Sequence, residues 1–532
     1  MSQRKKKLLG LTVVVLSMSL AVTTGCSSKT GIEGTASPQA SGGAATTAAN
    51  AKPIEIVWSN NFNSPESEEN LVQKKIEEKF NVKIKTVKFE RQSWKEKFNV
   101  LLASGQVPDI FPIDANETDM AAWADQGVIA SLSRDELKKN MPNYMKALEL
   151  TDAGAWDVGF YKGKDWGIPK VWPNGNSSFI PGYNEAWLKK VGYNEPPKTL
   201  AELEDVLTKF VNNDPDGNGK KDTYGMSARG KLPIQMFTSI FAAHGVNPYA
   251  FKLDADGKVV YGGITEETRT ALKLLDKWYK SGLIDPEFLT TDNGQLNEKF
   301  ANQKVGMVEN MGWGNFVNTS GFIAKPAADK GQNVIAGKPV VGPAGKPYSW
   351  SYGARQAPVL LGVHLEKDEA KRVKIEQILD FLATNDEYWL LTVYGEKGKN
   401  YDQPNGDFVV AKTDPEAATA KVGAGSFYNP LNAVDTAKQK FNTSNELREL
   451  KAKLDVGYEP LKDVIVPAVL SAKAKYWANL QTLQDKYLIK AITGAADTDK
   501  EFDTFKAEWL KAGGQELTDE ANKVYTERKA AK

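Results

Sequence analysis

Cysteine and histidine are almost absent from this chain, and each absence excludes a class of structure. A single cysteine, Cys26, in 532 residues excludes a disulfide framework, so we expect the fold to depend on core packing. The two histidines, His244 and His364, lie far apart in the sequence, and we expect each to be structural. An excess of charge is also missing, because 68 Lys and Arg oppose 67 Asp and Glu, and nothing therefore indicates a nucleic-acid partner.

Motifs of common catalytic sites are lacking as well. The sequence contains no G-x-S-x-G elbow, no GxxxxGK[ST] phosphate loop and no H-E-x-x-H metal motif. A glycosidase carboxylate pair stays open, because 67 acidic residues allow many pairs and their separation is a three-dimensional property. After Cys26 no apolar run reaches about 18 residues, so we expect no membrane-spanning helix in the mature chain.

The one long hydrophobic run lies near the N-terminus. Residues 8–22 are uncharged and follow four basic residues, which is typical of a secretory signal. Thr23, Thr24, Gly25 and Cys26 come next, and this stretch resembles a bacterial lipoprotein lipobox, although Thr23 replaces the usual leucine. The resemblance implies a signal peptide over residues 1–25 and a lipid on Cys26, whereas the alternative is an ordinary buried thiol. Residues 26–52 are mostly Ser, Thr, Ala and Gly and predict a disordered linker.

Strands and helices are predicted to alternate from residue 53. Ile54 to Trp58 fits a buried strand, and Ser64 with Pro65 predicts the start of a helix with an apolar stripe at Val72, Ile76 and Phe80. A strand over 82–89, a helix that ends near Gly105 and a strand over 108–111 follow. This order is typical of a parallel sheet covered by helices, so the predicted class is α/β.

Six stretches in order resemble the extracellular solute-binding proteins of carbohydrate ABC importers. They are ASGQVPDI (103–110), GVIASL (127–132), YKGKDWGIP (161–169), YNEAWLKKVG (183–192), WYKSGLIDPE (278–287) and KVGMV (304–308). YGEKGKNY (394–401) and WLKAGGQEL (509–517) are similar to the long oligosaccharide-binding lipoproteins of this family. The resemblance implies the two-lobe, type II fold of periplasmic binding proteins, with a hinged ligand cleft and extra C-terminal helices.

The resemblance also implies the division of the chain into lobes. Lobe 1 is expected over 53–166 and, with the hinge return, over 304–365, and lobe 2 over 167–303 and a mainly helical 366–532. It further implies a monomer that captures an oligosaccharide, delivers it to ABC permease subunits and touches the membrane only through its lipid, on the extracellular face.

The sharpest local motif is DPDGNGKKD at 214–222. Asp214, Asp216, Asn218 and Asp222 occupy positions one, three, five and nine of an EF-hand loop, and the Lys220 carbonyl occupies position seven. Position twelve is Gly225 instead of a glutamate, so Thr223 or water would have to complete the ligands of a structural calcium ion. Alginate-binding lipoproteins of the resembled family have a similar loop, and the alternative is a metal-free turn.

A sugar site needs aromatic rings that stack on C–H faces and polar groups that meet hydroxyls. The chain has 13 Trp and 18 Tyr, so position along the sequence has to select among them. Strand ends and the expected crossovers between lobes favour these candidates: Trp58, Asn60, Trp172, Trp313, Trp350, Tyr352 and Arg355. Arg355 could pair with a uronate or, alternatively, form an ordinary salt bridge.

Two alternatives to an oligosaccharide receptor stay open. The first is a secreted glycan-active hydrolase or lyase on the same anchor. The second is a binding protein for a peptide or a small signalling solute, in which case the aromatic residues would mainly belong to the core.

Overall fold

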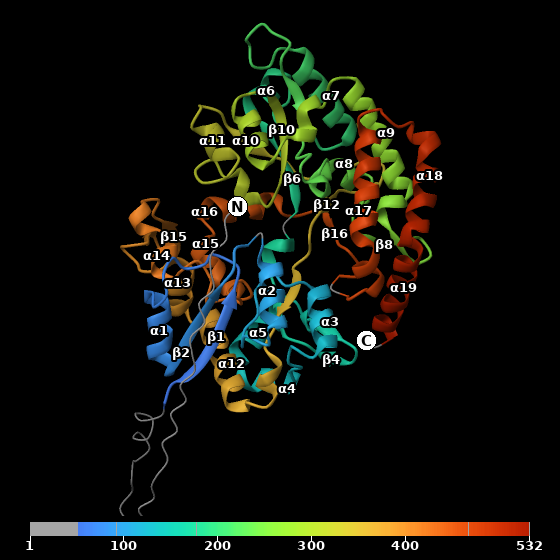
Figure 1. Ribbon diagram of the computed structural model, residues 1–532. Helices are drawn as coiled ribbons and strands as arrows, with labels where there is room; N and C mark the ends of the chain where they lie inside the picture. Colours follow the sequence, from blue (N-terminus) through green and yellow to red (C-terminus); the bar gives the residue numbers. More distant parts are fainter. Residues whose placement is uncertain (1–51, 92, 177, 467, 531–532) are drawn as a thin grey trace, which may run out of the picture. The chain divides into compact units, whose positions relative to one another are not determined.

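The chain from residue 53 builds two groups of elements, each around its own sheet (Figure 1). The structure, a computed structural model, describes residues 52–530 except 92, 177 and 467. The predicted signal peptide, Cys26 and nearly all of the predicted linker lie outside the described residues. Pro53–Lys532 forms one unit of contacts, and its hydrophobic clusters divide it into two lobes.

Lobe 1 is built on the parallel pair β1 (Ile54–Asn60) and β2 (Val82–Lys88). Ile110 pairs in parallel with Trp58 and in antiparallel with Leu361, so the third position of this sheet is a single bridge and not a full strand. The remaining strands of lobe 1 are short: β3 (Phe160–Tyr161), β4 (Lys164–Asp165), β5 (Ile168–Val171), β13 (Arg355–Val359), β14 (Tyr401–Asn405) and β15 (Phe408–Ala411).

Helices of lobe 1 pack on this sheet and on one another, with α1 beside β2 and α12 beside α5 (Figure 1). The helices are α1 (Leu71–Phe80), α2 (Trp94–Ala103), α3 (Glu117–Gln126), α4 (Arg134–Asn140), α5 (Pro142–Thr151), α12 (Glu369–Thr384), α13 (Asp386–Tyr394), α14 (Thr419–Val422) and α15 (Gln439–Asn442).

Lobe 2 contains a four-stranded mixed sheet in the order β11-β6-β10-β7. Strand β10 pairs in antiparallel with β6 and in parallel with β7. The strands of lobe 2 and of its border are β6 (Phe179–Asn184), β7 (Tyr224–Met226), β8 (Phe251–Leu253), β9 (Val259–Tyr261), β10 (Val305–Met311), β11 (Val334–Ala336), β12 (Tyr348–Trp350) and β16 (Glu459–Leu461).

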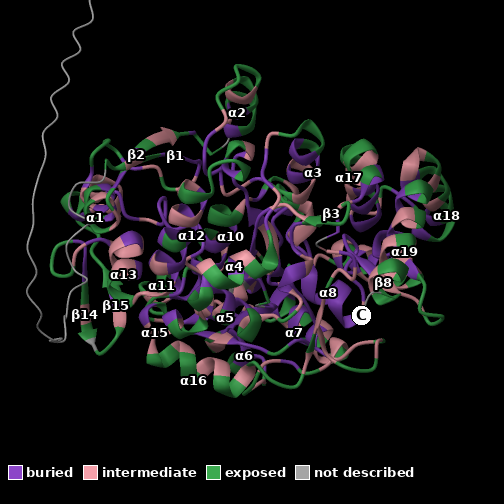
Figure 2. Ribbon diagram, turned by 90° about the horizontal axis from the view of Figure 1, so that it is seen from below, coloured by how far each residue is buried: buried purple, intermediate pink, exposed green. Residues whose placement is uncertain are grey.

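The helices of lobe 2 include a C-terminal set, α17 and α18, that packs against α9 (Figure 1). Burial separates the helices sharply: every residue of α8 is buried, whereas α16 has no buried residue (Figure 2). The helices are α6 (Glu185–Lys190), α7 (Leu200–Asn212), α8 (Thr238–Ala243), α9 (Glu266–Lys280), α10 (Asn293–Ala301), α11 (Ala324–Ala328), α16 (Asn445–Leu454), α17 (Ser471–Ile492), α18 (Thr498–Trp509) and α19 (Gln515–Ala530). None of the helices in the described residues is long and apolar enough to cross a membrane.

The predicted α/β class and two-lobe fold are confirmed, and one segment packs on the lobe other than the expected one. Residues from 366 onward were expected in lobe 2. Instead, Ile375 and Leu379 of α12, together with Phe427 and Tyr428, belong to the same buried cluster as Ile56 of β1. The amphipathic stripe of α12 fits either core, so the stripe alone does not identify the lobe that it covers. The chain returns to lobe 2 only at α16 and α17.

The first helix also begins later than predicted. Ser64 and Pro65 precede an irregular segment, and α1 starts at Leu71. Asn70 is the N-cap, because its side-chain oxygen accepts a hydrogen bond from the Gln73 N–H at 3.0 Å. The predicted stripe is nonetheless present, since Val72 and Ile76 are fully buried on this helix.

Two crossover segments connect the lobes and pair with each other. The first runs from β5 to β6 and contains Trp172, and the second runs from β12 to β13 and contains Tyr352. The Trp172 N–H donates to the Ala354 carbonyl at 2.7 Å, and the Gly353 N–H donates to the Gly175 carbonyl at 3.0 Å. A Cβ on Gly175 would lie 2.3 Å from the Gly353 oxygen, so this close backbone pairing requires a glycine.

A fully buried carboxylate, Asp109, ties lobe 1 together at the loop before the Ile110 bridge. Its Oδ2 accepts the Val57 N–H at 2.6 Å and lies 2.7 Å from the Lys371 ammonium on α12. Its Oδ1 lies 2.6 Å from Nε2 of His364. Burial alone would raise the pKa of Asp109, but the hydrogen bonds from His364, Lys371 and Val57 hold it below its usual value.

We expect Asp109→Asn to lower the free energy of unfolding by about 3 kcal/mol at pH 7, because Lys371 loses its buried counter-charge. Since the Asp109 pKa is lowered on folding, its contribution is complete above the ordinary carboxyl value and disappears as the pH falls through the lowered pKa. Urea denaturation of both proteins at pH 7 and at strongly acid pH measures this difference.

Asp125→Asn is the matched control, because Asp125 forms an exposed ion pair with Lys162 at 2.6 Å. An equal loss of stability in the two variants, or a loss at Asp109 that does not depend on pH, would contradict the assignment.

Candidate functional site

A cavity of about 680 Å³ opens in lobe 1 beside the first crossover. Phe62 follows β1, Asp114 follows the bridge at Ile110, and Lys170 and Trp172 lie at the end of β5. Since β1 and Ile110 run in parallel, their carboxyl ends meet at one edge, which is where open α/β sheets bind ligands. We call this space the lobe 1 cavity.

Aromatic rings line the lobe 1 cavity from two sides. Phe62, Trp172 and Tyr394 are half-buried, so part of each side chain is still accessible. The Arg91 guanidinium lies over the Phe62 ring, 4.7 Å from its centre. Trp389 is nearly buried and stacks on Phe441 with ring centres 5.5 Å apart. The cavity thus offers flat apolar faces of the kind that a sugar ring needs.

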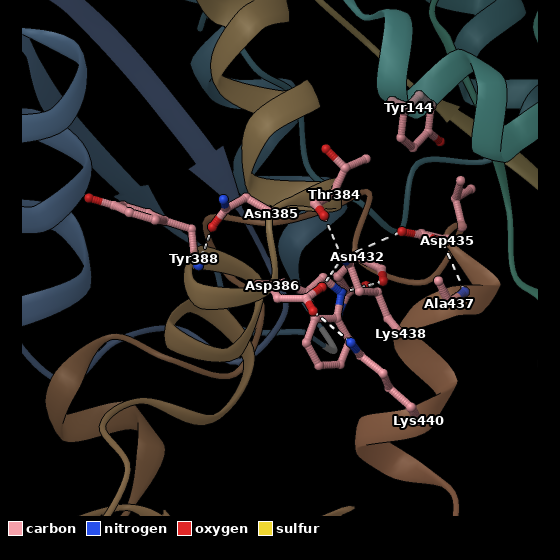
Figure 3. Close-up of polar contacts among 12 residues, drawn as sticks. Tyr144, Thr384, Asn385, Asp386, Tyr388, Asn432, Asp435, Ala437, Lys438 and Lys440 are labelled. Atoms are coloured by element: carbon pink, nitrogen blue, oxygen red, sulfur yellow. Dashed lines mark hydrogen bonds and ion pairs between the residues drawn. The ribbon is translucent and has the colours of Figure 1, made fainter. Parts of the chain in front are cut away.

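A polar cluster around Lys438 forms another part of the lining (Figure 3). The Lys438 ammonium contacts the Asp386 carboxylate and the Thr384 carbonyl, and it lies 3.5 Å from Asp435. Lys440 approaches the other oxygen of Asp386 at 2.7 Å. The two lysines hold α13 and α15 together and lower the pKa of Asp386, although its partial burial acts in the opposite direction.

Two further acidic residues in the lining are paired as well. Asp114 accepts hydrogen bonds from the Arg91 Nε and the Asn61 amide, both at 2.9 Å. Glu117, at the start of α3, lies 3.2 Å from the ammonium of Lys473 on α17.

Lobe 2 has a smaller pocket of about 470 Å³ whose lining includes Phe179, Arg229, Gln235 and Asn310. Arg229 is 4% exposed, and it donates to the Gln235 side chain and to the Glu309 main-chain carbonyl, each at 2.8 Å. Burial lowers the pKa of Arg229 to about 10, so the guanidinium stays charged at neutral pH. We call this space the lobe 2 pocket.

The crossovers connect the lobe 1 cavity with the lobe 2 pocket. Trp172 and Phe179 lie on the same crossover, one at each end. Tyr352 on the other crossover accepts a hydrogen bond from Gln235 at 2.7 Å, and its ring centre lies 6.0 Å from that of Phe179. A ligand that touches both pockets would therefore lie along the two hinge segments.

The predicted ligand residues divide into two groups in the structure. Trp172 lines the lobe 1 cavity, and Tyr352, which is 40% exposed, borders the lobe 2 pocket through Gln235. Trp58, Trp313 and Trp350 are 0%, 2% and 3% exposed. Trp58 and Trp313 belong to hydrophobic clusters, and the Trp350 ring packs edge-on against Phe179 and Tyr352. The three rings are thus covered in this structure, and their role in sugar binding stays a prediction.

Asn60 and Arg355 have structural partners instead of free polar groups. Asn60 is 1% exposed, and its amide donates to the Phe427 carbonyl at 2.9 Å. Arg355 Nε donates to Asp152 at 2.8 Å, and its Nη1 donates to Asp157 at 3.2 Å. Burial would raise the pKa of Asp152, but Arg355 keeps it below its usual value. The salt-bridge alternative for Arg355 is thus the one observed.

Sequence reasoning missed Phe62, Lys170, Trp389 and Arg229. Lys170 and Trp172 are two residues apart at the end of an extended segment, where such side chains point to the same side, so the lysine before a selected tryptophan was a usable signal. Trp389 and Lys438 come from the segment that is expected in lobe 2, so their position beside the lobe 1 residues of this cavity could not be expected from the sequence.

The predicted calcium loop folds as a tight turn in lobe 2. The Asp214 carboxylate accepts the N–H groups of Asn218 and Gly219 at 3.1 Å each, and Gly219 has a φ of 75° that favours glycine at this position. The Asn218 amide nitrogen lies 2.6 Å from Asp216 Oδ2 and 3.1 Å from Asp222 Oδ1. Within the described residues, no group of three His, Cys, Asp or Glu side chains is gathered closely enough to hold a metal ion.

Neither Gly225 nor Thr223 replaces the missing glutamate of this loop. A Cβ on Gly225 would lie 2.9 Å from the Leu207 Cβ, so the position has no room for a side chain. Thr223 is buried, and its hydroxyl donates to the Phe210 carbonyl at 2.8 Å. Lys304 lies 2.6 Å from Asp222 and lowers the pKa of this carboxylate.

Comparison with known proteins identifies the class. The family model described as bacterial extracellular solute-binding protein matches residues 72–356, which is more than half of the chain. The chain therefore belongs to the bacterial extracellular solute-binding proteins.

Relatives and solved structures agree with this class. The polygalacturonan/rhamnogalacturonan-binding protein YtcQ of Bacillus subtilis is 26% identical over 82% of this chain and 84% of that protein. Lipoprotein LipO of the same organism is 27% identical over 86% of this chain and 89% of that protein. A structure of an EF-hand mutant of the Streptococcus pneumoniae substrate-binding protein FusA with fructo-nystose covers 90% of this chain and 100% of that chain, with a TM-score of 0.64 and 20% identity.

Because Arg355 forms ion pairs within the protein, we expect its substitution to change the stability of the fold and not the preference for a ligand. Arg355→Gln should lower the free energy of unfolding by about 2 kcal/mol, because two partly buried aspartates lose their partner. Thermal or urea unfolding measures this change, and isothermal titration with neutral and acidic oligosaccharides should give the same preference before and after the substitution.

Arg134→Gln is a matched control, since Arg134 pairs with Asp165 at 2.7 Å but is more exposed, and we expect a loss below about 1 kcal/mol. A selective loss of acidic ligands in Arg355→Gln with unchanged stability would instead restore Arg355 as a ligand residue.

Proposed function

We propose that this chain is the substrate-binding lipoprotein of a carbohydrate ABC importer, which captures an extracellular oligosaccharide and delivers it to permease subunits. The observation that carries the proposal is the lobe 1 cavity, where accessible aromatic rings and polar side chains line a space of about 680 Å³ beside the interlobe crossovers. This combination suits sugar rings, which present flat C–H faces and hydroxyl edges. The names of several relatives, which include oligosaccharide-binding proteins, support the same cargo class.

Binding is coupled to closure in this proposal. An oligosaccharide that contacts Trp172 in the lobe 1 cavity and Arg229 or Gln235 in the lobe 2 pocket interacts more strongly when the pockets approach each other. It therefore favours the closed state by its differential affinity for closed over open. The paired crossovers are the segments that bend, and the permease recognises the closed form.

The anchor follows from the N-terminal sequence and from the class. Extracellular solute-binding proteins act outside the cytoplasm, and the relative LipO is named as a lipoprotein. Cys26 follows a predicted signal and would bear the lipid, and residues 27–52 would connect it to the folded unit, which works as a monomer. The protein would thus be held at the extracellular face of the cell membrane.

A calcium ion in the loop at 214–222 is the second part of the proposal. The carboxylates of Asp214, Asp216 and Asp222, the Asn218 amide oxygen and the Lys220 carbonyl are hard oxygen donors of the kind that calcium prefers. Burial, and then the neighbouring Asp214 and Asp222, raise the pKa of Asp216, so a cation would relieve charge repulsion in this loop. The Asn218 amide nitrogen already lies between two carboxylates, and rotation of that amide would place its oxygen there instead.

Water would complete the coordination, because Gly225 and Thr223 are not free to do so. The ion would brace the loop between α7 and β7, outside the residues that line the two pockets. The FusA protein whose EF-hand was mutated has the same fold, and its EF-hand supports such a loop here.

The sugar proposal predicts a direct role for Trp172. Trp172→Ala should weaken the binding of an oligosaccharide by about tenfold to a hundredfold, because the ring face that covers a sugar is lost. Isothermal titration of the Pro53–Lys532 unit with a panel of neutral and acidic oligosaccharides first identifies the ligand and then compares the variants. Trp477→Ala, at a half-buried tryptophan of α17 outside both pockets, is the control and should keep the wild-type affinity. Peptide or solute binding with no response to any glycan would reject the proposal.

The calcium proposal predicts a metal-dependent stability. Adding a chelator should lower the melting temperature of the wild-type unit, and excess calcium should restore it, because an ion that binds only the folded state stabilises by mass action. The double variant Asp214→Asn, Asp216→Asn should melt at the same temperature with and without calcium. Asp254→Asn, in the exposed turn between β8 and β9, is the control. If the melting temperature of the wild-type unit changes with neither chelator nor calcium, the loop is a metal-free turn.

A further inference from the structure

Lys170 is a buried cation in the lining of the lobe 1 cavity. It lies on β5, where it pairs with Gln356 of β13, and the residue is 6% exposed. Trp172, two residues further along the same segment, lines the same cavity. The alternation of side chains along an extended segment thus directs the ammonium and the accessible indole toward one space.

Within the part of the chain that the structure describes, the Lys170 side chain forms neither a hydrogen bond nor an ion pair. The nearest influence is the charge of Asp114, which acts at a distance and whose carboxylate is already bonded to Arg91 and Asn61. Removing most of the water around a cation without giving it a protein partner is unfavourable, so a ligand anion at this position would relieve that cost.

The other charged side chains that line the described cavity differ from Lys170 in this respect. Arg91 pairs with Asp114, and Glu117 pairs with Lys473. Lys438 pairs with Asp386 and Asp435. Lys170 is therefore the site of one uncompensated positive charge at the end of β5, beside a ring that is suited to stacking.

We propose that Lys170 forms an ion pair with an acidic group of the bound sugar, so that the cargo is an oligosaccharide with uronate units. The inference rests on the proposed function, because it assigns the chemistry of the ligand in the same cavity. A uronate provides one negative charge at the edge of a ring whose C–H face can stack on Trp172. A sulfate ester on a sugar provides the same single charge, and the experiment separates the two sources.

Burial lowers the pKa of Lys170 to about 8, which leaves the ammonium mostly protonated at neutral pH. An anionic ligand would place a negative charge beside the ammonium, in place of the water that burial removes. A neutral sugar hydroxyl could accept a hydrogen bond from Lys170 but would leave the charge uncompensated.

The test compares matched ligands on the Pro53–Lys532 unit. The probes are trisaccharides of galacturonate, mannuronate and glucuronate, their carboxyl-reduced neutral counterparts, and a sulfated neutral trisaccharide, all measured by isothermal titration at one ionic strength. We expect at least one uronate trisaccharide to bind ten times or more tighter than its reduced form. Tight binding of the sulfated sugar alone would overturn the uronate assignment.

Variants then connect the preference to Lys170. Lys170→Met should weaken uronate binding by about tenfold to a hundredfold and change neutral binding less than threefold, while Lys170→Arg should keep the preference. Lys139→Met, at an exposed lysine of α4, is the matched control and should bind as the wild type does. Without ligand, Lys170→Met should melt at or above the wild-type temperature, because it removes an unpaired buried charge and keeps an unbranched chain.

Three further results would overturn the inference. Neutral trisaccharides could bind while uronates do not. This result would support the receptor function and reject only the proposal that the cargo is acidic. Lys170→Met could weaken acidic and neutral sugars equally or lower the melting temperature strongly, which would make Lys170 structural. Binding of no glycan at all would reject the proposed function and the inference together.

Discussion

The backbone pairing of the two crossover segments is the constraint on which the site depends. Hydrogen bonds from Trp172 to Ala354 and from Gly353 to Gly175 fix the register of the segments. Trp172, Phe179 and Tyr352 all lie on these segments, so the same bonds position the rings that border both pockets. Bending at these segments would change the separation of the two pockets, which is what a closing receptor requires.

Charge is distributed so that structure and recognition use different residues. The buried carboxylate of Asp109 is fully surrounded by Val57, His364 and Lys371, and Arg355 binds two aspartates at the base of β13. These contacts stabilise lobe 1. Lys170 has the opposite character, because it is buried and, among the described residues, no carboxylate forms an ion pair with it, although the charge of Asp114 acts on it. We therefore propose that the partner of this charge is a group of the ligand.

The order of the helices and strands could be predicted from the sequence much better than the distant segments on which each of them packs. Strong local signals, such as the stripe of Val72 and Ile76 on α1, depend only on near neighbours and were correct. The position of Trp58 at a strand end is visible in the sequence, but the ring that packs against it, Tyr428, comes from a distant segment. The same limitation applies to α12, because an apolar stripe does not identify the core on which it packs. Lys170 was missed because an unpaired charge can be recognised only when all its neighbours are known.

A crystal structure of Pro53–Lys532 with its oligosaccharide bound would test the central claim most directly. The account predicts a sugar ring on the accessible face of Trp172, an acidic group beside the Lys170 ammonium and a second contact from Arg229 or Gln235 across the crossovers. A ligand in the separate groove of about 730 Å³ that is lined by Pro197, Val334 and Leu450, with the lobe 1 cavity left empty, would contradict it.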